Sequence, residues 1–163
     1  MTMNLFLESL FASGCRDIYS LIAGYIERWQ WPRRVHDRRI KELFDKKRRD
    51  GNVKATYFKC SASDGLSLYS VVAYFVQSVI LPTKRCECQC RAFIKLCDLI
   101  DGFVAIPRGL VTGTHLLQLA ETFLQSFEKA WGLESTTPKF HWLLHMGGSL
   151  TALWLFFCKV VGC

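Results

Sequence analysis

Two sets of side chains in this sequence have the chemistry of metal ligands. His141 and His145 are four residues apart, so on a helix both imidazoles would face the same way and could share one zinc ion. Cys86, Cys88 and Cys90 alternate along a second segment. Zinc sites usually leave two to four residues between cysteines, which argues against this triplet. We therefore predict that the two histidines pack in a helix interface, that the cysteines are free thiols and that the protein has no cofactor. A zinc-stabilised helical domain is an alternative, ranked third among the hypotheses for this chain.

Patterns for other catalytic chemistry are missing from the sequence. The two histidines have no glutamate between them in the positions that a zinc hydrolase needs, and there is no nucleophile elbow or glycine-rich phosphate loop. Four carboxylates have the chemistry to hold magnesium, but we expect them on helix surfaces: Asp98, Asp101, Glu121 and Glu128. The sequence therefore predicts a protein that is not an enzyme.

The positive charge of the chain is confined to one segment. Between Arg28 and Lys54 there are 11 Lys and Arg against 4 Asp and Glu, and the rest of the chain has 10 of each. Such a segment predicts contact with a polyanion, here non-specific nucleic acid, because no aromatic side chains alternate with the cations. The alternative is a solvated helix face whose acids form ordinary i, i+4 pairs. The candidate contacts are Arg33, Arg34, Arg38, Arg39, Lys41, Lys46, Lys47, Arg48 and Arg49.

The compartment is predicted to be intracellular and, from the Lys46–Arg49 cluster, nuclear. Eight cysteines are too few for a disulfide scaffold, and no basic flank precedes the apolar start of the chain. Two apolar runs, Leu66–Leu81 and Leu150–Cys163, suggest an alternative, a small membrane-associated protein whose basic segment faces lipid headgroups. The first run has 16 residues, fewer than the roughly 20 that span a bilayer, so core helices are the preferred reading.

The periodicity predicts a mainly α protein, an irregular multi-helix domain with at most one short strand or hairpin near 53–61. Four regions are expected: an amphipathic helix in 1–31, a basic helix in 32–52, a helical core in 53–146 and an apolar tail in 147–163. Within them we predict helices over Arg16–Trp29, Arg33–Arg49, Leu66–Leu81, Phe93–Gly102 and Thr114–Trp131, and a further helix from Thr137.

Several local signals refine these predictions. Gly51 and Asn52 are expected to end the basic helix, and Thr83–Gln89 to be a loop that holds the cysteine triplet. Thr114 is expected to cap the last strong helix and Gly132 to end it. The buried face of that helix is predicted to consist of Leu117, Ala120, Leu124, Phe127 and Trp131.

The segment Pro138–His145 (PKFHWLLH) resembles the phrase PKFHxLLH of transposase-like proteins of DNA transposons, in the helical C-terminal portion of that RNase-H-like superfamily. The likeness covers about Cys90–Met146. It implies an α/β core with three metal-binding carboxylates, but the strands that would hold them are missing here. Only a helix-forming role is carried over, to Phe140, His141, Trp142 and His145.

The resemblance predicts a catalytically incomplete, transposase-derived fragment. Its partners would be nucleic acid, bound non-specifically, and a parent transposase or a second copy that packs on apolar helices; a membrane partner is not expected. Relatives continue from the phrase into a proline and a further helix, whereas Gly147-Gly148 and an apolar tail follow here. The tail 147–163 therefore departs from the family's pattern, as a truncated or frame-altered end would.

Overall fold

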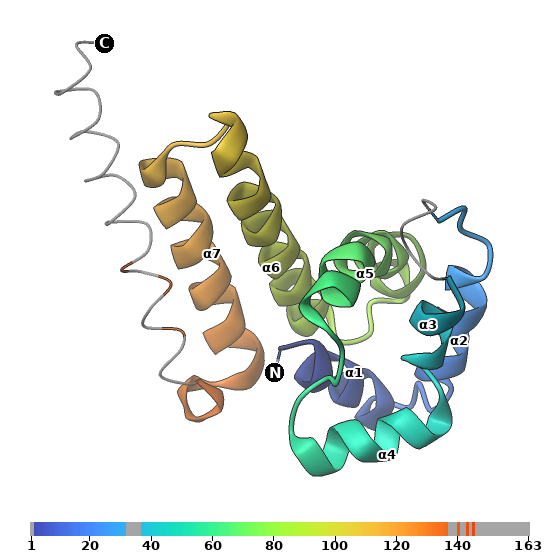
Figure 1. The fold of residues 1–163 in the computed structure, drawn as a ribbon. Coiled ribbons are helices and arrows are strands. Elements are labelled where there is room, and N and C mark those ends of the chain that lie inside the picture. The colour runs from blue at the N-terminus through green and yellow to red at the C-terminus, as the bar shows by residue number, and fades with distance from the viewer. Residues whose placement is uncertain (1, 32–36, 137–139, 141–142, 144, 146–163) are drawn as a thin grey trace, which may run out of the picture. The chain divides into compact units, whose positions relative to one another are not determined.

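The computed structural model describes residues 2–31, 37–136, 140, 143 and 145. These residues form seven α-helices and no strand, which confirms the mainly α prediction (Figure 1). The helices are α1 (Thr2–Ala12), α2 (Ile18–Ile26), α3 (Asp37–Glu42), α4 (Lys46–Ala55), α5 (Ala62–Phe75), α6 (Glu87–Ala105) and α7 (Gly113–Trp131). Short turns of other helix types are a π turn at Val76–Ile80 and 3-10 turns at Leu81–Thr83, Ile106–Arg108 and Leu133–Ser135.

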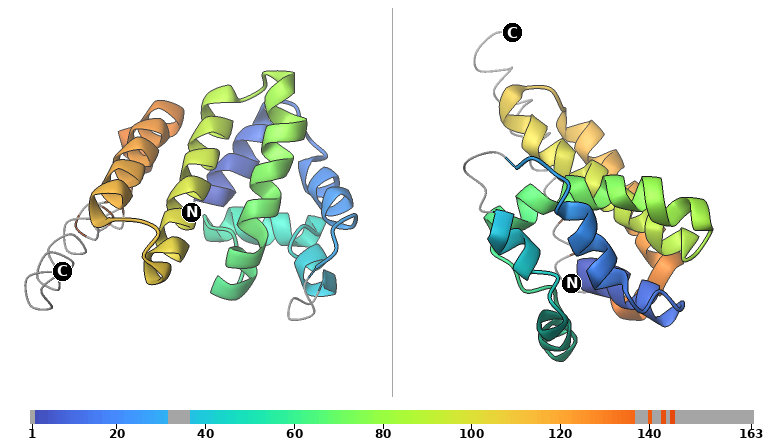
Figure 2. Two further views of the ribbon diagram at one scale, coloured as in Figure 1. Left: turned by 90° about the horizontal axis from the view of Figure 1, so that it is seen from above. Right: turned by 90° about the vertical axis from the view of Figure 1, so that its right-hand side faces the viewer.

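The chain divides into two compact units, Met1–Phe93 and Ile94–Cys163. Aromatic contacts in the core of the first unit join helices that are distant in sequence. Phe6 of α1 stacks on Phe93 with ring centroids 4.7 Å apart, and Tyr25 of α2 meets the edge of Phe75 of α5 at 5.1 Å. Figure 2 shows α1, α2 and α5 from two further sides. Apolar side chains of α1, α2 and α5 are thus buried against neighbouring helices, as expected for amphipathic helices.

In the second unit, α7 packs against the last turns of α6. Its buried residues are Leu116, Ala120, Phe123 and Phe127. The predicted face is therefore right at Ala120 and Phe127, and one residue off at Leu117 and Leu124. Trp131 is half-buried, with its ring 4.9 Å from that of Phe127. Gly102 lets α6 approach closely, because a Cβ there would lie 2.8 Å from Cδ1 of Leu119. Gly132 ends α7 at φ 77° and donates to the Glu128 carbonyl at 2.8 Å, as predicted.

The strand predicted over Val53–Ser61 is wrong. Val53, Lys54 and Ala55 form the last turn of α4, and Thr56 ends that helix in the left-handed region at φ 60°. The described residues contain no second strand to pair with, and a lone strand is not stable. Phe58 is buried instead against Phe44, with ring centroids 5.5 Å apart. The β-forming residues therefore serve side-chain packing.

The prediction of a single basic helix over Arg33–Arg49 is also wrong, because the structure has two helices, α3 and α4, separated by a break at 43–45. Leu43 and Phe44 turn inward at this break and are buried. Asp45 is extended there, with ψ 146°, and is the N-cap residue that precedes α4. Gly51 and Asn52 do not end the helix but lie inside it.

Three boundary predictions need correction. Thr112, not Thr114, caps α7, with its hydroxyl accepting from the His115 amide at 3.2 Å. Cys88 and Cys90 lie in α6 rather than in a loop, and α6 continues past Gly102 to Ala105. The cap of α7 and the end of α6 differ from the prediction by two and three residues, whereas α6 begins at Glu87, six residues before the predicted Phe93.

The apolar run Leu66–Leu81 belongs to a longer helical stretch than predicted. Ser61 caps α5 by accepting from the Asp64 amide at 3.1 Å, and the π and 3-10 turns extend the stretch to Thr83. The resulting 22 residues, Ala62–Thr83, are long and apolar enough to cross a membrane by length and composition. Contrary to what the 16-residue run suggested, the helical stretch is therefore not too short to cross a bilayer, although core helices of soluble proteins have the same properties.

Candidate nucleic-acid interface

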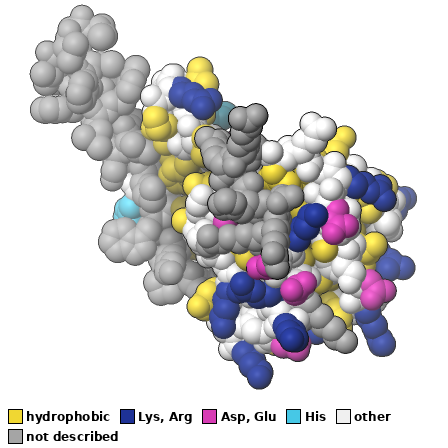
Figure 3. Space-filling model, turned by 45° about the vertical axis from the view of Figure 1, so that its right-hand side comes forward, with side chains coloured by type: hydrophobic (Ala, Val, Ile, Leu, Met, Phe, Trp, Pro, Cys, Tyr) yellow, Lys and Arg dark blue, Asp and Glu magenta, His cyan; other side chains and the backbone are white. Residues whose placement is uncertain are grey.

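The outer side of α4 carries the exposed cations of the basic segment. Lys47 and Lys54 are seven residues apart and therefore share one helix face, with Arg48 on its flank; all three are exposed. Lys59, in the segment after α4, is exposed as well. Within the part of the chain that the structure describes, no ion pair joins these four to a carboxylate. Figure 3 shows Lys and Arg side chains spread over one face, with fewer Asp and Glu among them.

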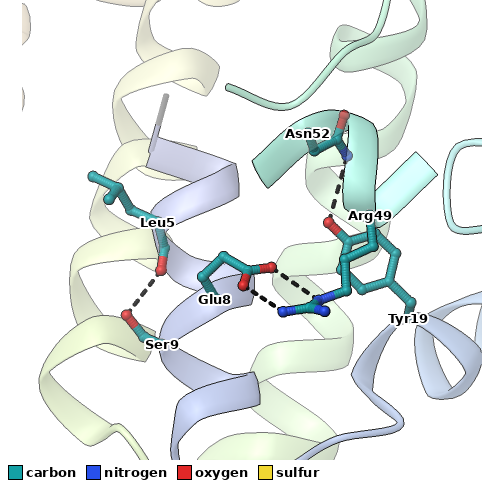
Figure 4. A network of polar contacts seen from close by, with 6 residues as sticks. All are labelled: Leu5, Glu8, Ser9, Tyr19, Arg49 and Asn52. Carbon is teal, nitrogen blue, oxygen red and sulfur yellow. Dashed lines mark hydrogen bonds and ion pairs between the residues drawn. The ribbon is translucent and has the colours of Figure 1, made fainter. Parts of the chain in front are cut away.

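Arg49 faces the opposite way and is a structural residue. Its Nε and Nη2 donate to the two carboxylate oxygens of Glu8 at 3.2 and 2.7 Å (Figure 4). Its guanidinium carbon lies 3.6 Å from the centroid of the Phe11 ring. The two charged side chains are only 24% and 29% exposed, so the paired fork is held between α1 and α4. Its guanidinium is already engaged with Glu8, so the interface is assigned to the other cations.

Asn52 explains why α4 continues through a sequence that favours a stop. Its side chain is 1% exposed and donates through Nδ2 to the Tyr19 hydroxyl at 3.4 Å. Its Oδ1 accepts from the Lys59 amide at 3.0 Å. Burial raises the pKa of Tyr19, so its hydroxyl stays protonated. Asn52 therefore ties α4 to α2 and fixes the segment that follows the helix.

The other predicted contacts are described to different extents. Lys41 lies 3.8 Å from Glu27 in an exposed pair, which is a weak interaction. Arg38 and Arg39 lie in α3 and Lys46 begins α4, where the structure describes the backbone only. Arg33 and Arg34 lie outside the described residues.

An open pocket of about 380 Å³ lies beside the exposed cations. The break before α4, the segment after α4 and the start of α5 all contribute to it. Of its lining residues, Leu43 is buried and Tyr57 is 51% exposed. The complete lining consists of Leu43, Arg48, Tyr57, Lys59, Cys60, Ser61 and Asp64.

The three cysteines considered for zinc have different environments. Cys86 donates to the Ser9 carbonyl at 3.4 Å, Cys88 is exposed and Cys90 is buried. Burial raises the pKa of Cys90 to about 12, so its thiol is protonated at neutral pH, whereas zinc binds the thiolate. Among the described residues, no group of three or more His, Cys, Asp or Glu side chains could hold a metal ion. His145 is exposed, and His141 lies outside the described residues.

The four carboxylates considered for magnesium are distributed over two helices. Asp98 of α6 pairs with Lys95 at 2.9 Å, one turn away on the same helix. Asp101 is exposed on α6, and Glu121 and Glu128 are exposed on α7. They lie on helix surfaces, as expected.

The phrase that carries the resemblance is described at Phe140, Leu143 and His145, all three helical. The ring of Phe140 meets Phe127 at 4.7 Å and Phe123 at 5.8 Å, both edge-on. This residue therefore packs on α7. Pro138, Lys139, Trp142, Leu144 and the tail 147–163 lie outside the described residues.

Sequence reasoning missed Glu8, Asn52 and Tyr57. Glu8 and Arg49 are 41 residues apart, and no local pattern marks such a pair. A signal did exist at Tyr57, an aromatic between Lys54 and Lys59, but the pattern there predicted a strand.

Compared with known proteins, the chain matches no family model, no curated protein and no solved structure.

Proposed function

We propose that this chain is a transposase-derived helical protein, without catalytic activity, that binds nucleic acid non-specifically through α4. One observation carries the proposal. The whole excess charge of the sequence lies between Arg28 and Lys54, and Lys47, Arg48 and Lys54 of that segment are exposed without an ion-pair partner in the described structure. Unpaired cations on one face attract the phosphate backbone, because each contact releases condensed counterions.

The transposase ancestry is supported by the sequence PKFHWLLH. A nuclear location remains part of the proposal. In the Lys46–Arg49 cluster, Lys47 and Arg48 are exposed while Arg49 is engaged with Glu8. Of Lys47, Arg48 and Arg49, only Lys47 and Arg48 are therefore exposed for binding by a nuclear-import receptor.

Replacing both Lys47 and Lys54 with alanine should weaken duplex DNA binding severalfold. It should also reduce the slope of log affinity against log salt by about 2, since each lost phosphate contact removes about 0.9. Fluorescence anisotropy with a labelled duplex at several salt concentrations measures both quantities. A matched control replaces Arg108 and Lys129, exposed cations of the second unit, and makes the same change in net charge. Equal losses in the two double variants would show that total charge, not α4, determines binding.

The second candidate function is membrane association, favoured by the helical stretch Ala62–Thr83. Against it, one side of this stretch is buried in the first unit, at Leu68, Val71, Val72, Phe75, Val76 and Ile80. Fractionation separates the candidates. A nucleic-acid-binding protein should be recovered in the soluble fraction after mild salt, whereas recovery only with detergent would support the membrane candidate.

A further inference from the structure

The pocket beside α4 combines features that the basic surface alone does not have. Its lining includes the aromatic residue Tyr57, the two basic residues Arg48 and Lys59, and the acidic residue Asp64. Leu43, which is buried, supplies its apolar part. Its volume of about 380 Å³ is within the range of small-ligand pockets, roughly 300–1,000 Å³. These dimensions suit a single nucleotide.

Each part of a nucleotide has a matching group in the lining. A nucleobase stacks on an aromatic ring whatever its identity, because every base has a π face. Arg48 and Lys59 match the phosphate charge. Asp64 accepts the Ser61 hydroxyl at 2.6 Å, and its carboxylate is also an acceptor for base amino groups or sugar hydroxyls. The lining thus combines groups that match a ligand carrying both a phosphate and hydrogen-bond donors.

The position of Tyr57 is set by the helices. Thr56 turns the chain in the left-handed region at the end of α4, and Asn52 holds the Lys59 amide at 3.0 Å. Phe58 is buried between these two points. With its neighbours on both sides anchored, Tyr57 remains 51% exposed in the pocket wall. An aromatic residue presented in this way costs little entropy when a base stacks on it.

We propose that this pocket receives one unpaired nucleotide of a single strand, with its base on Tyr57 and its phosphate between Arg48 and Lys59. The proposal rests on the proposed nucleic-acid binding and specifies its substrate class. Bases inside a duplex are stacked on their neighbours and do not reach such a pocket, so a single strand gains a contact that a duplex lacks. The protein therefore binds duplexes through charge and single strands through charge plus one stacked base.

The test compares three labelled ligands with the full chain by fluorescence anisotropy: an oligothymidylate strand, a duplex of the same length and an abasic strand of the same length. Replacing Tyr57 with alanine should weaken binding of the oligothymidylate about tenfold, within the range known for one stacked base. Duplex and abasic binding should be unchanged. Tyr57→Phe keeps the aromatic face and should bind as the original protein does, whereas Tyr57→Leu should lose as much as Tyr57→Ala.

The matched control is Tyr74→Ala, since Tyr74 is 55% exposed on α5 and is not part of the pocket lining. It should leave all three affinities unchanged. Equal weakening of all three ligands by Tyr57→Ala, or no weakening of any, overturns the pocket while the charge-based function stands. If the original protein binds none of the three ligands, both proposals fall. Thymidine monophosphate as a competitor of the strand distinguishes a strand site from a free-nucleotide site, because a strand site requires the charge of the neighbouring phosphates.

Discussion

Replacing Arg49 with alanine should lower the free energy of unfolding by about 2–3 kcal/mol, although its place in a run of four cations suggests a surface residue. The change leaves the Glu8 carboxylate partly buried without a cation and removes the contact with the Phe11 ring. Urea unfolding followed by circular dichroism measures the loss. The partial exposure of the pair, 24% and 29%, places the expected value below that of a fully buried ion pair.

The neighbouring residue supplies the control for this prediction. Arg48 is exposed, so Arg48→Ala should change the free energy of unfolding by no more than about 0.5 kcal/mol while weakening nucleic-acid binding. Glu8→Ala combined with Arg49→Ala completes a double-mutant cycle, in which the two losses should not add. If Arg49→Ala left stability intact and reduced binding as Arg48→Ala does, the guanidinium would belong to the binding surface.

Phe127→Ala should be the most destabilising substitution in the second unit, with a loss of about 3–5 kcal/mol. Its side chain is fully buried on α7 and contacts Phe140 at 4.7 Å and Trp131 at 4.9 Å, as well as Phe123. Deleting the ring leaves a cavity that three neighbouring aromatic rings line and cannot easily fill. The same urea unfolding measures the effect.

A matched variant on the same helix tests the assignment of its faces. Leu124 is only half-buried, although the periodicity placed it on the buried side, so Leu124→Ala should cost about 1 kcal/mol. A loss for Leu124→Ala as large as that for Phe127→Ala would mean that α7 is rotated relative to the described packing. Circular dichroism of both variants before unfolding shows whether each still folds.

Helices with a strong apolar period were predictable from the sequence. The stripe at Ile18, Ile22 and Ile26 gave α2, and Gly132 marked the end of α7, because both signals depend only on neighbouring residues. The α4 region was not predictable in this way. There the local preferences of Gly51, Asn52 and Val53 were opposed by tertiary contacts, above all the two hydrogen bonds of Asn52.

The candidate site was predictable only as a concentration of charge. Counting residues between Arg28 and Lys54 identified the cations but treated Arg48 and Arg49 as equivalent, whereas one is exposed and the other is paired with Glu8. The position of Tyr57 beside the cations depends on the break at 43–45 and on the left-handed turn at Thr56. Residue propensities predict neither feature. A left-handed conformation at Thr56 is especially hard to predict, because non-glycine residues seldom adopt it.

The amide of Asn52 links ligand binding to the folding of the first unit. It holds the backbone of the pocket segment with one atom and the buried Tyr19 hydroxyl with another. A molecule in the pocket therefore binds only while α2, α4 and that segment are folded together. By mass action, a ligand at one hundred times its dissociation constant adds about 2.7 kcal/mol to the stability of that state. A nucleic acid that occupies the pocket would thus stabilise the folded first unit, and the melting temperature of α2 would rise with the concentration of that nucleic acid.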